Sequence, residues 1–195
     1  NLEVLAAKAE ATGSWLWVDM EDSSYVDRTL ELFRKLRAKH EKVGLCLQSY
    51  LRRTPGDLTA LLPLKPAIRL VKGAYAEPAH VAFPVKRDVD LAFYELSVKL
   101  LEAARDGAAL PVLGTHDVPL LGRIIARAAD LGVQDGAYEI HMLYGIRMAE
   151  QRALAGQGRK VRTLISYGAH WFPWYMRRLA ERPANVWFVM KSMLR

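Results

Sequence analysis

Short apolar runs alternate with longer amphipathic segments along most of the chain. Six runs have the length and aliphatic character of buried strands: residues 15–19, 43–48, 67–71, 111–114, 138–141 and 162–165. Three segments between them place apolar side chains at helical spacing beside charged ones: residues 27–39, 88–105 and 120–131. This alternation predicts an α/β fold with a parallel sheet and right-handed crossovers.

Each predicted strand ends in a polar residue or a polar cluster, which includes Asp19, Gln48, Lys72, residues 115–117, His141 and Ser166. In a TIM barrel the carboxyl ends of the strands form the edge at which active sites are built. The pattern predicts a distorted (βα)8 barrel with about six βα units visible, expected to be strands three to eight. We therefore expect residues 1–195 to form a single barrel domain that is incomplete at its N-terminus. The long connection over residues 77–86 is expected to form part of a lid.

Composition narrows the class of protein. The chain has 195 residues, of which 51% are hydrophobic and 25% charged, so it can bury a core and is neither disordered nor fibrous. Its single cysteine, Cys46, excludes an internal disulfide framework and is expected in the core. No apolar run approaches the roughly 18 residues of a membrane span, which predicts a soluble protein. The net charge of +7 is scattered, which suits a small anion or a cofactor phosphate and offers no basic stripe for nucleic acid.

Two segments offer side chains suited to anions. Arg69 lies on the inner face of a predicted strand, and Lys72 follows where a glycine lets the backbone turn toward a ligand. Pairing of Arg69 with an internal carboxylate, with Lys72 solvated, is the structural alternative. Farther along, Arg177 and Arg178 are adjacent, which suits bidentate binding of one carboxylate. The structural alternative is that the two arginines form ordinary ion pairs with Glu181, which lies at helical spacing from them.

Strand-end carboxylate and imidazole groups leave several interpretations open. Asp19 suits a general base, a helix cap or a counter-ion, and the nearby predicted arginines favour the counter-ion. His116, Asp117 and His141 admit a metal site, although their spacings match no compact ligand motif. A metal-dependent barrel hydrolase or lyase that uses these four residues is therefore an alternative function.

Four separate blocks together resemble bacterial proline dehydrogenase: RLVKGAY at residues 69–75, GTHD at 114–117, EIHMLYG at 139–145 and YMRRLAE at 175–181. The order and spacing of the blocks match as well, and the similarity runs from about residue 15 to the C-terminus. The resemblance implies a distorted (βα)8 barrel that binds FAD and oxidises L-proline to Δ1-pyrroline-5-carboxylate in proline catabolism. It further implies hydride transfer to flavin N5 and a membrane quinone as the electron acceptor.

The resemblance also assigns roles to individual residues. It implies that Arg69 lies beside the flavin N5 and that Asp19 belongs to the active site, so these two are the expected catalytic residues. Arg177 and Arg178 are expected to bind the proline carboxylate. Leu164 occupies the position at which many members of the family have an active-site tyrosine, so it is expected to contact the substrate. The implied cofactor-binding residues are Gln48, Arg69, Lys72, Gly73, Ala74, Thr115, His116, Leu143 and Glu181, with no metal ligand among them.

The implied partners are L-proline and a quinone, without nucleic acid. A quinone-linked enzyme must visit the bilayer surface, and the excess of positive charge predicts weak, salt-sensitive contact with anionic lipid. The expected location is the cytoplasm, with peripheral contact at the inner face of the cell membrane. Asp117 and His141 depart from the asparagine and glutamine that are common in the family. A barrel fragment that binds FAD without catalysis is a further alternative.

Overall fold

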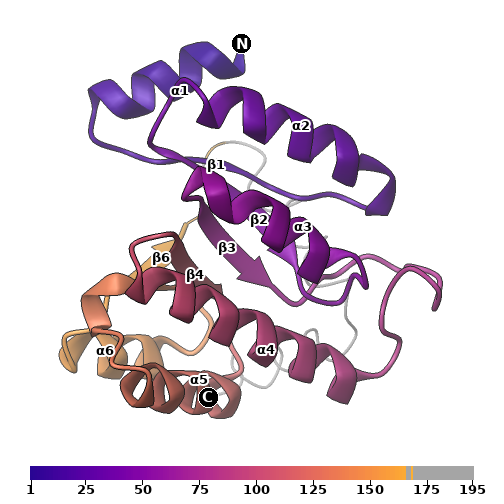
Figure 1. Ribbon diagram of the computed structural model, residues 1–195. Helices are drawn as coiled ribbons and strands as arrows, with labels where there is room; N and C mark the ends of the chain where they lie inside the picture. The colour runs from indigo at the N-terminus through magenta and orange to yellow at the C-terminus, as the bar shows by residue number, and fades with distance from the viewer. Residues whose placement is uncertain (166–167, 169–195) are drawn as a thin grey trace.

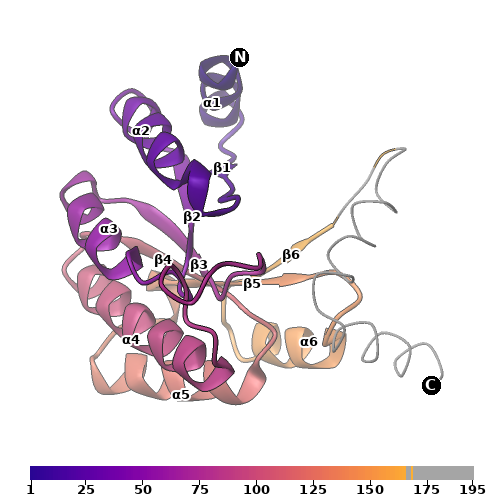
Figure 2. The same cartoon turned by 90° about the vertical axis from the view of Figure 1, so that its right-hand side faces the viewer.

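All six predicted strands are present in residues 1–165 and 168, the part of the chain that the computed structural model describes. They form one parallel sheet whose spatial order follows the sequence. The strands are β1 (Leu16–Val18), β2 (Val43–Gln48), β3 (Ala67–Val71), β4 (Leu110–Gly114), β5 (Glu139–Leu143) and β6 (Val161–Leu164). The sheet curls as part of a barrel wall does (Figure 2), which confirms the expected TIM-barrel type of fold.

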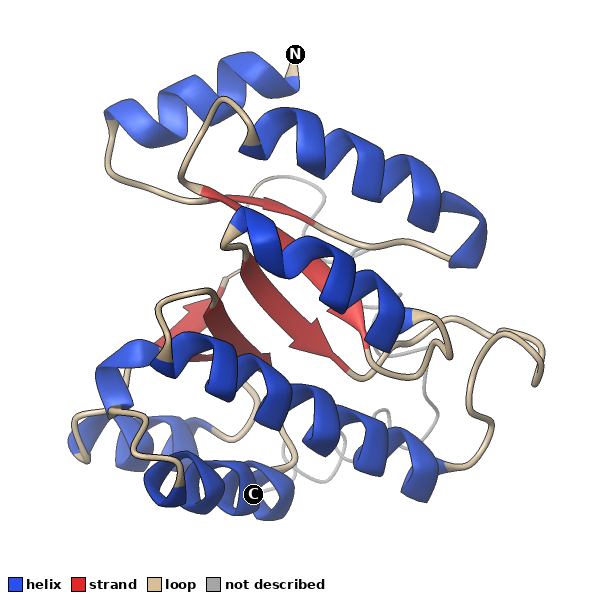
Figure 3. Cartoon of the chain, in the orientation of Figure 1, coloured by secondary structure: helices blue, strands red, loops and turns tan. Residues whose placement is uncertain are grey.

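Helices pack on the convex side of this sheet (Figures 1 and 3). The α-helices of the described chain are α1 (Leu2–Ala11), α2 (Val26–Arg37), α3 (Thr54–Leu61), α4 (Lys86–Arg105), α5 (Val118–Asp130) and α6 (Met148–Gly156). Short 3₁₀ helices occupy Ser23–Tyr25, Leu62–Leu64 and Asp135–Ala137. No helix within residues 1–165 is both long and apolar enough to cross a bilayer.

The helices α2, α4 and α5 correspond to the three predicted amphipathic segments, with small shifts at their ends. The pattern did not predict α3 or α6. Helix α3 has Pro55 and Gly56, which are typical of turns, in its first turn, and the only buried side chain of α6 is the polar Gln151. Apolar periodicity is therefore a weak signal for both of these helices.

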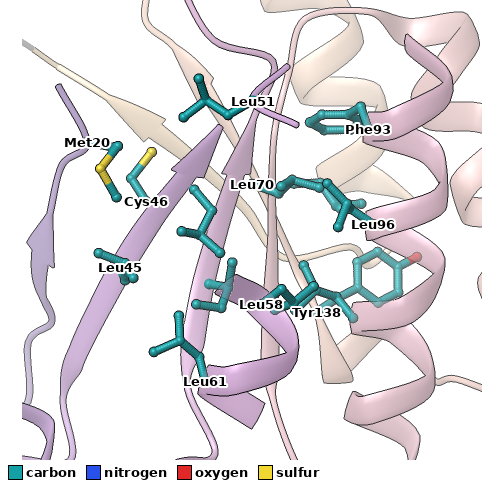
Figure 4. Close-up of a cluster of buried hydrophobic side chains, with 14 of the residues drawn as sticks. Met20, Leu45, Cys46, Leu51, Leu58, Leu61, Leu70, Phe93, Leu96 and Tyr138 are labelled. Carbon is teal, nitrogen blue, oxygen red and sulfur yellow. The ribbon is translucent and has the colours of Figure 1, made fainter. Parts of the chain in front are cut away.

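Alternation along the strands separates the core from the concave face. Leu45, Ile68 and Leu70 are completely buried between the sheet and the helices. Figure 4 shows Leu70 beside Phe93 and Leu96 of α4. The intervening positions face the concave side, and on β2 these are the small or polar residues Gly44, Cys46 and Gln48. Cys46 is buried, as expected.

Trp17 of β1 crosses part of the concave side because Gly44 makes room for it. The two residues are paired in the register of β1 and β2, and a Cβ on Gly44 would lie 2.5 Å from Trp17 Cζ3. The indole reaches His141 of β5 in an edge-to-face arrangement, with 5.6 Å between ring centroids. A glycine on β2 thus lets a side chain from the first strand contact the fifth.

We expect Gly44→Ala to lower the free energy of unfolding by about 1–3 kcal/mol, because the added methyl group must displace the packed indole. Chemical denaturation measures this change. Gly122→Ala in α5 is the matched control: no heavy atom of the described chain lies within 4 Å of its added Cβ, so it is expected to stabilise by about 0.5–1 kcal/mol. Equal stability of Gly44→Ala and wild type would contradict the proposed packing.

Candidate active site

A cavity of about 590 Å³ opens on the concave side at the carboxyl ends of the strands. This volume lies within the usual range of small-molecule sites. The described residues to which the resemblance assigns a role all line this one cavity: Asp19, Gln48, Arg69, Lys72, Gly73, Ala74, Thr115, His116, Leu143 and Leu164. The remaining three, Arg177, Arg178 and Glu181, lie outside the described residues.

The guanidinium of Arg69 is bound on two sides. Asp19, from the end of β1, forms an ion pair with it, and the Trp17 ring lies beneath it with 5.0 Å between the ring centroid and Cζ. The Arg69 side chain is mostly buried, whereas that of Asp19 is exposed. A fixed positive charge therefore lies in the wall of the cavity, with its orientation set by a carboxylate and an aromatic face.

Gln48 presents a polar atom that lacks a partner. The residue is only 4% exposed, and its Nε2 donates a long hydrogen bond of 3.4 Å to the carbonyl of Met20. Its buried Oε1 accepts no hydrogen bond from the residues described. Because a buried acceptor without a donor costs free energy, this atom is suited to a donor supplied by a ligand in the cavity.

Lys72 is enclosed by carboxylates. Its Nζ lies 2.5 Å from Asp90 Oδ1 and 2.6 Å from Asp117 Oδ2, and its side chain is 13% exposed, so the alternative of a solvated lysine is wrong. Burial opposes ionisation of Asp117, but the hydrogen bonds from Lys72 and Leu120 N, together with the charges of Lys72 and Lys86, outweigh it and lower the pKa of that carboxyl. Asp117 also caps α5 by accepting a hydrogen bond from Leu120 N at 3.2 Å. These contacts join the end of β3 to the starts of two helices.

Gly73 has a structural reason for being glycine. Its φ of +105° lies in the region that favours glycine, and an added Cβ would lie 2.2 Å from Cδ1 of Tyr50. The Tyr50 ring therefore packs directly against the backbone at this turn. That packing, and not only the approach of a ligand, explains why the chain turns with a glycine after Lys72.

His116 links the ends of β4 and β5. Its Nε2 lies 2.8 Å from the backbone N–H of Leu143, and because that group can only donate, the ring nitrogen must accept. The imidazole proton is thereby placed on Nδ1. Burial, together with the charge of Arg147, lowers the pKa of His116, which favours the neutral ring. Thr115 Oγ1 accepts a hydrogen bond from Asp117 N at 3.1 Å and closes the same turn.

A buried carboxylate that the sequence pattern did not single out lies deeper in the concave face. Glu139 accepts two hydrogen bonds from Arg162, at 2.6 and 2.9 Å, and lies 3.1 Å from Nε2 of His141. Burial opposes its ionisation, but the hydrogen bonds of His141 and Arg162 outweigh this and lower the pKa of Glu139 to about 2. Only the pairing of β5 with β6 brings Arg162 to this carboxylate.

The side chains considered for a metal site have other partners. Asp117 binds Lys72 and caps a helix, His116 accepts from a backbone N–H, and His141 contacts Glu139. Among residues 1–165 and 168, no group of three or more histidine, cysteine or acidic side chains is arranged to hold a metal ion. The geometry therefore does not support the metal-dependent hydrolase or lyase.

The fold and this site define an α/β protein of the TIM-barrel type, with a small-molecule cavity that an arginine and several hydrogen-bonding groups line at the carboxyl ends of its strands. The sequence model of the family described as proline dehydrogenase matches residues 1–191. The chain belongs to the proline dehydrogenase family.

Curated relatives agree with the family model. The chain is 42% identical over 197 residues to proline dehydrogenase from Deinococcus radiodurans, which covers 100% of this chain and 62% of that protein. It is also 42% identical over 195 residues to proline dehydrogenase 1 from Bacillus subtilis strain 168, which covers 100% of this chain and 63% of the relative. The chain thus spans less than two thirds of the length of these relatives.

Solved structures of proline utilization A share the fold. A structure with proline bound in remote sites has a TM-score of 0.83 and 26% identity, covering 98% of this chain and 22% of that one. A mutant of the Bradyrhizobium japonicum protein has a TM-score of 0.81 and 26% identity with the same coverage. The described sheet and helices therefore share the architecture of these proteins.

Glu139→Gln tests the buried carboxylate. Because the folded pKa of about 2 lies below the ordinary 4.5, the ionised carboxylate stabilises the fold above about pH 4.5, and that stabilisation is lost as the pH falls toward 2. We expect the substitution to cost about 3 kcal/mol at neutral pH and progressively less below pH 4.5, as measured by denaturation at several pH values. Glu31→Gln, which breaks an exposed pair with Lys35, is the control and is expected to leave stability nearly unchanged at every pH, because solvent screens the pair. A neutral-pH cost no larger than that of the control would contradict the assignment.

Proposed function

We propose that this chain forms the cofactor- and substrate-binding part of a proline dehydrogenase that oxidises L-proline to Δ1-pyrroline-5-carboxylate with FAD. In this reaction proline loses a hydride from C5 and a proton from nitrogen, and a quinone finally receives both electrons and two protons. The observation that carries the proposal is the convergence on one cavity of ten residues to which the resemblance assigns a role, seven of them from three of the matching sequence blocks, in a chain that belongs to this family.

The unpartnered Oε1 of Gln48 supports FAD as the ligand. The ring system of oxidised FAD has several acceptor atoms and a single N–H donor, which suits a buried acceptor beside an arginine. Arg69 supplies N–H donors for the ring acceptors, and the chain of Lys72, Gly73 and Ala74 runs along the same cavity. Further contacts are proposed for Thr115, His116, Leu143 and Glu181.

FAD supplies the hydride acceptor when it is bound. The protein contributes position and charge. Arg69 offers a positive charge where negative charge accumulates during the reaction, and Asp19 together with Trp17 keeps the guanidinium in place without a change of geometry. We assign Asp19 to this role of counter-ion.

Substrate binding is assigned to Arg177 and Arg178, which together suit the planar carboxylate of proline. Leu164 lines the cavity from β6 and is 49% exposed, so it offers an apolar surface where related proteins often have a hydroxyl group. Loss of that hydroxyl changes the contact with the proline ring from a polar one to an apolar one. The quinone acceptor and a salt-sensitive contact with anionic lipid at the cytoplasmic membrane face belong to the same proposal.

A visible absorbance spectrum of the protein with FAD, before and after anaerobic addition of L-proline, tests the function. We expect a protein-bound flavin spectrum that bleaches on addition of proline, because the flavin is reduced. Bound flavin that remains oxidised would support the non-catalytic alternative. Failure to bind FAD would contradict both.

Arg69→Ala separates catalysis from substrate binding. We expect it to slow flavin reduction by proline about 100-fold or more, with a smaller effect on the proline dissociation constant, because it removes a donor directed at the developing charge. Stopped-flow absorbance over a range of proline concentrations measures both quantities. Arg69→Lys, which keeps the charge but not the planar fork, is expected to lie between Arg69→Ala and wild type. Equal losses in rate and binding would refute the role of Arg69.

A further inference from the structure

The loops that follow β1 and β3 contact each other although β2 lies between these strands in the sheet. Ser23 donates two hydrogen bonds to Glu77, from its backbone N to Oε1 at 2.7 Å and from its hydroxyl to Oε2 at 2.7 Å. The Tyr75 hydroxyl, in the loop after β3, donates to Glu21, which lies in the loop after β1 together with Ser23. Both oxygens of one half-buried carboxylate are thus directed at a single residue 54 positions away.

The loop that carries Glu77 is itself fixed to the segment after β2. Phe83 N donates to the carbonyl of Tyr50 at 2.8 Å, and Gly73 packs against the ring of the same tyrosine. Contacts on both sides of residue 77 therefore hold this loop against Tyr50, which follows β2. Consequently Glu77 is a fixed acceptor on which the position of Ser23 depends.

The loop that carries Ser23 also positions two groups of the candidate active site. Met20 is buried, and its carbonyl accepts the hydrogen bond from Gln48 Nε2. Because a carbonyl can only accept, this contact assigns the NH2 end of the amide to Met20 and leaves Oε1 for a ligand. Asp19, in the same loop, pairs with Arg69.

We propose that Glu77 is a positioning residue of the candidate active site, which holds residues 19–23 so that Gln48 keeps its Oε1 directed to the N–H donor of the bound flavin ring. This inference rests on the proposed function, since FAD is the ligand that supplies the donor. Glu77 acts through Ser23 and Met20 and needs no contact with FAD. It is therefore distinct from the cofactor-binding residues described above.

A double-mutant cycle on FAD affinity tests this role, with titration of flavin fluorescence by the apoprotein as the measurement. We expect Glu77→Ala to weaken FAD binding about tenfold, which is the affinity carried by one hydrogen bond. In a Gln48→Ala background the same change is expected to weaken binding by a clearly smaller factor, about threefold or less, because only the pair of Asp19 with Arg69 still depends on Glu77. Equal fold-changes in the two backgrounds would overturn the proposal, since a general loss of stability would act in both.

Two serine variants complete the test. Ser23→Ala removes one of the two hydrogen bonds to Glu77 and retains the other, so we expect a smaller loss of affinity that is again reduced in the Gln48→Ala background. Ser24→Ala is the matched control, because its hydroxyl contacts Asp22 and not Glu77, and it is expected to bind FAD as wild type does. If Glu77→Ala does not fold, the Ser23→Ala pair decides the question.

The same titrations separate this inference from the proposed function. A wild-type protein that does not bind FAD overturns the function, whatever the variants do. A wild-type protein that binds FAD, with Glu77→Ala and Ser23→Ala binding equally well, overturns the positioning role of Glu77 alone.

Discussion

The constraint on which the structure depends is the two-residue alternation of parallel strands that bury one face against helices. The strands direct most of their larger aliphatic side chains outward, as β3 does with Ile68 and Leu70. Many positions of the other face then carry small or polar side chains, and the carboxyl ends of the strands bring these together. A cavity with Gln48 and Arg69 in its wall is the direct result, because both side chains project from the concave face of the sheet on the neighbouring strands β2 and β3.

Charged groups inside this curved sheet have partners of opposite charge. Arg69 pairs with Asp19, Lys72 lies between two aspartates, and Glu139 is bound by Arg162. Removing such groups from water is costly unless an opposite charge and hydrogen bonds compensate. The pairs therefore fix the geometry of the cavity wall before any ligand arrives, which is the arrangement that electrostatic stabilisation of a reacting molecule requires.

Hydrogen bonds between loops also link strands that are not neighbours in the sheet, and these bonds hold the residues of the site in position. The contact between Glu77 and Ser23 joins the connections after β1 and β3 across the end of β2. A chain that belongs to the proline dehydrogenase family and spans less than two thirds of its curated relatives thus contains, within its described part, a cavity together with the contacts that hold its wall.

The sequence by itself determined the class of fold, since apolar runs of strand length separated by amphipathic helices permit few arrangements other than a helix-covered parallel sheet. It also placed Gln48 and His116 at strand ends and Arg69 on the inner face of a strand, where the edge of such a sheet gathers them. It could not determine contacts that depend on curvature and loop path. The bond from Leu143 N to His116, the pairing of Glu139 with Arg162 and the two bonds from Ser23 to Glu77 join residues far apart in the chain. Only the tertiary structure decides these partners, because hydrogen bonds require distances of about 3 Å that no local pattern encodes.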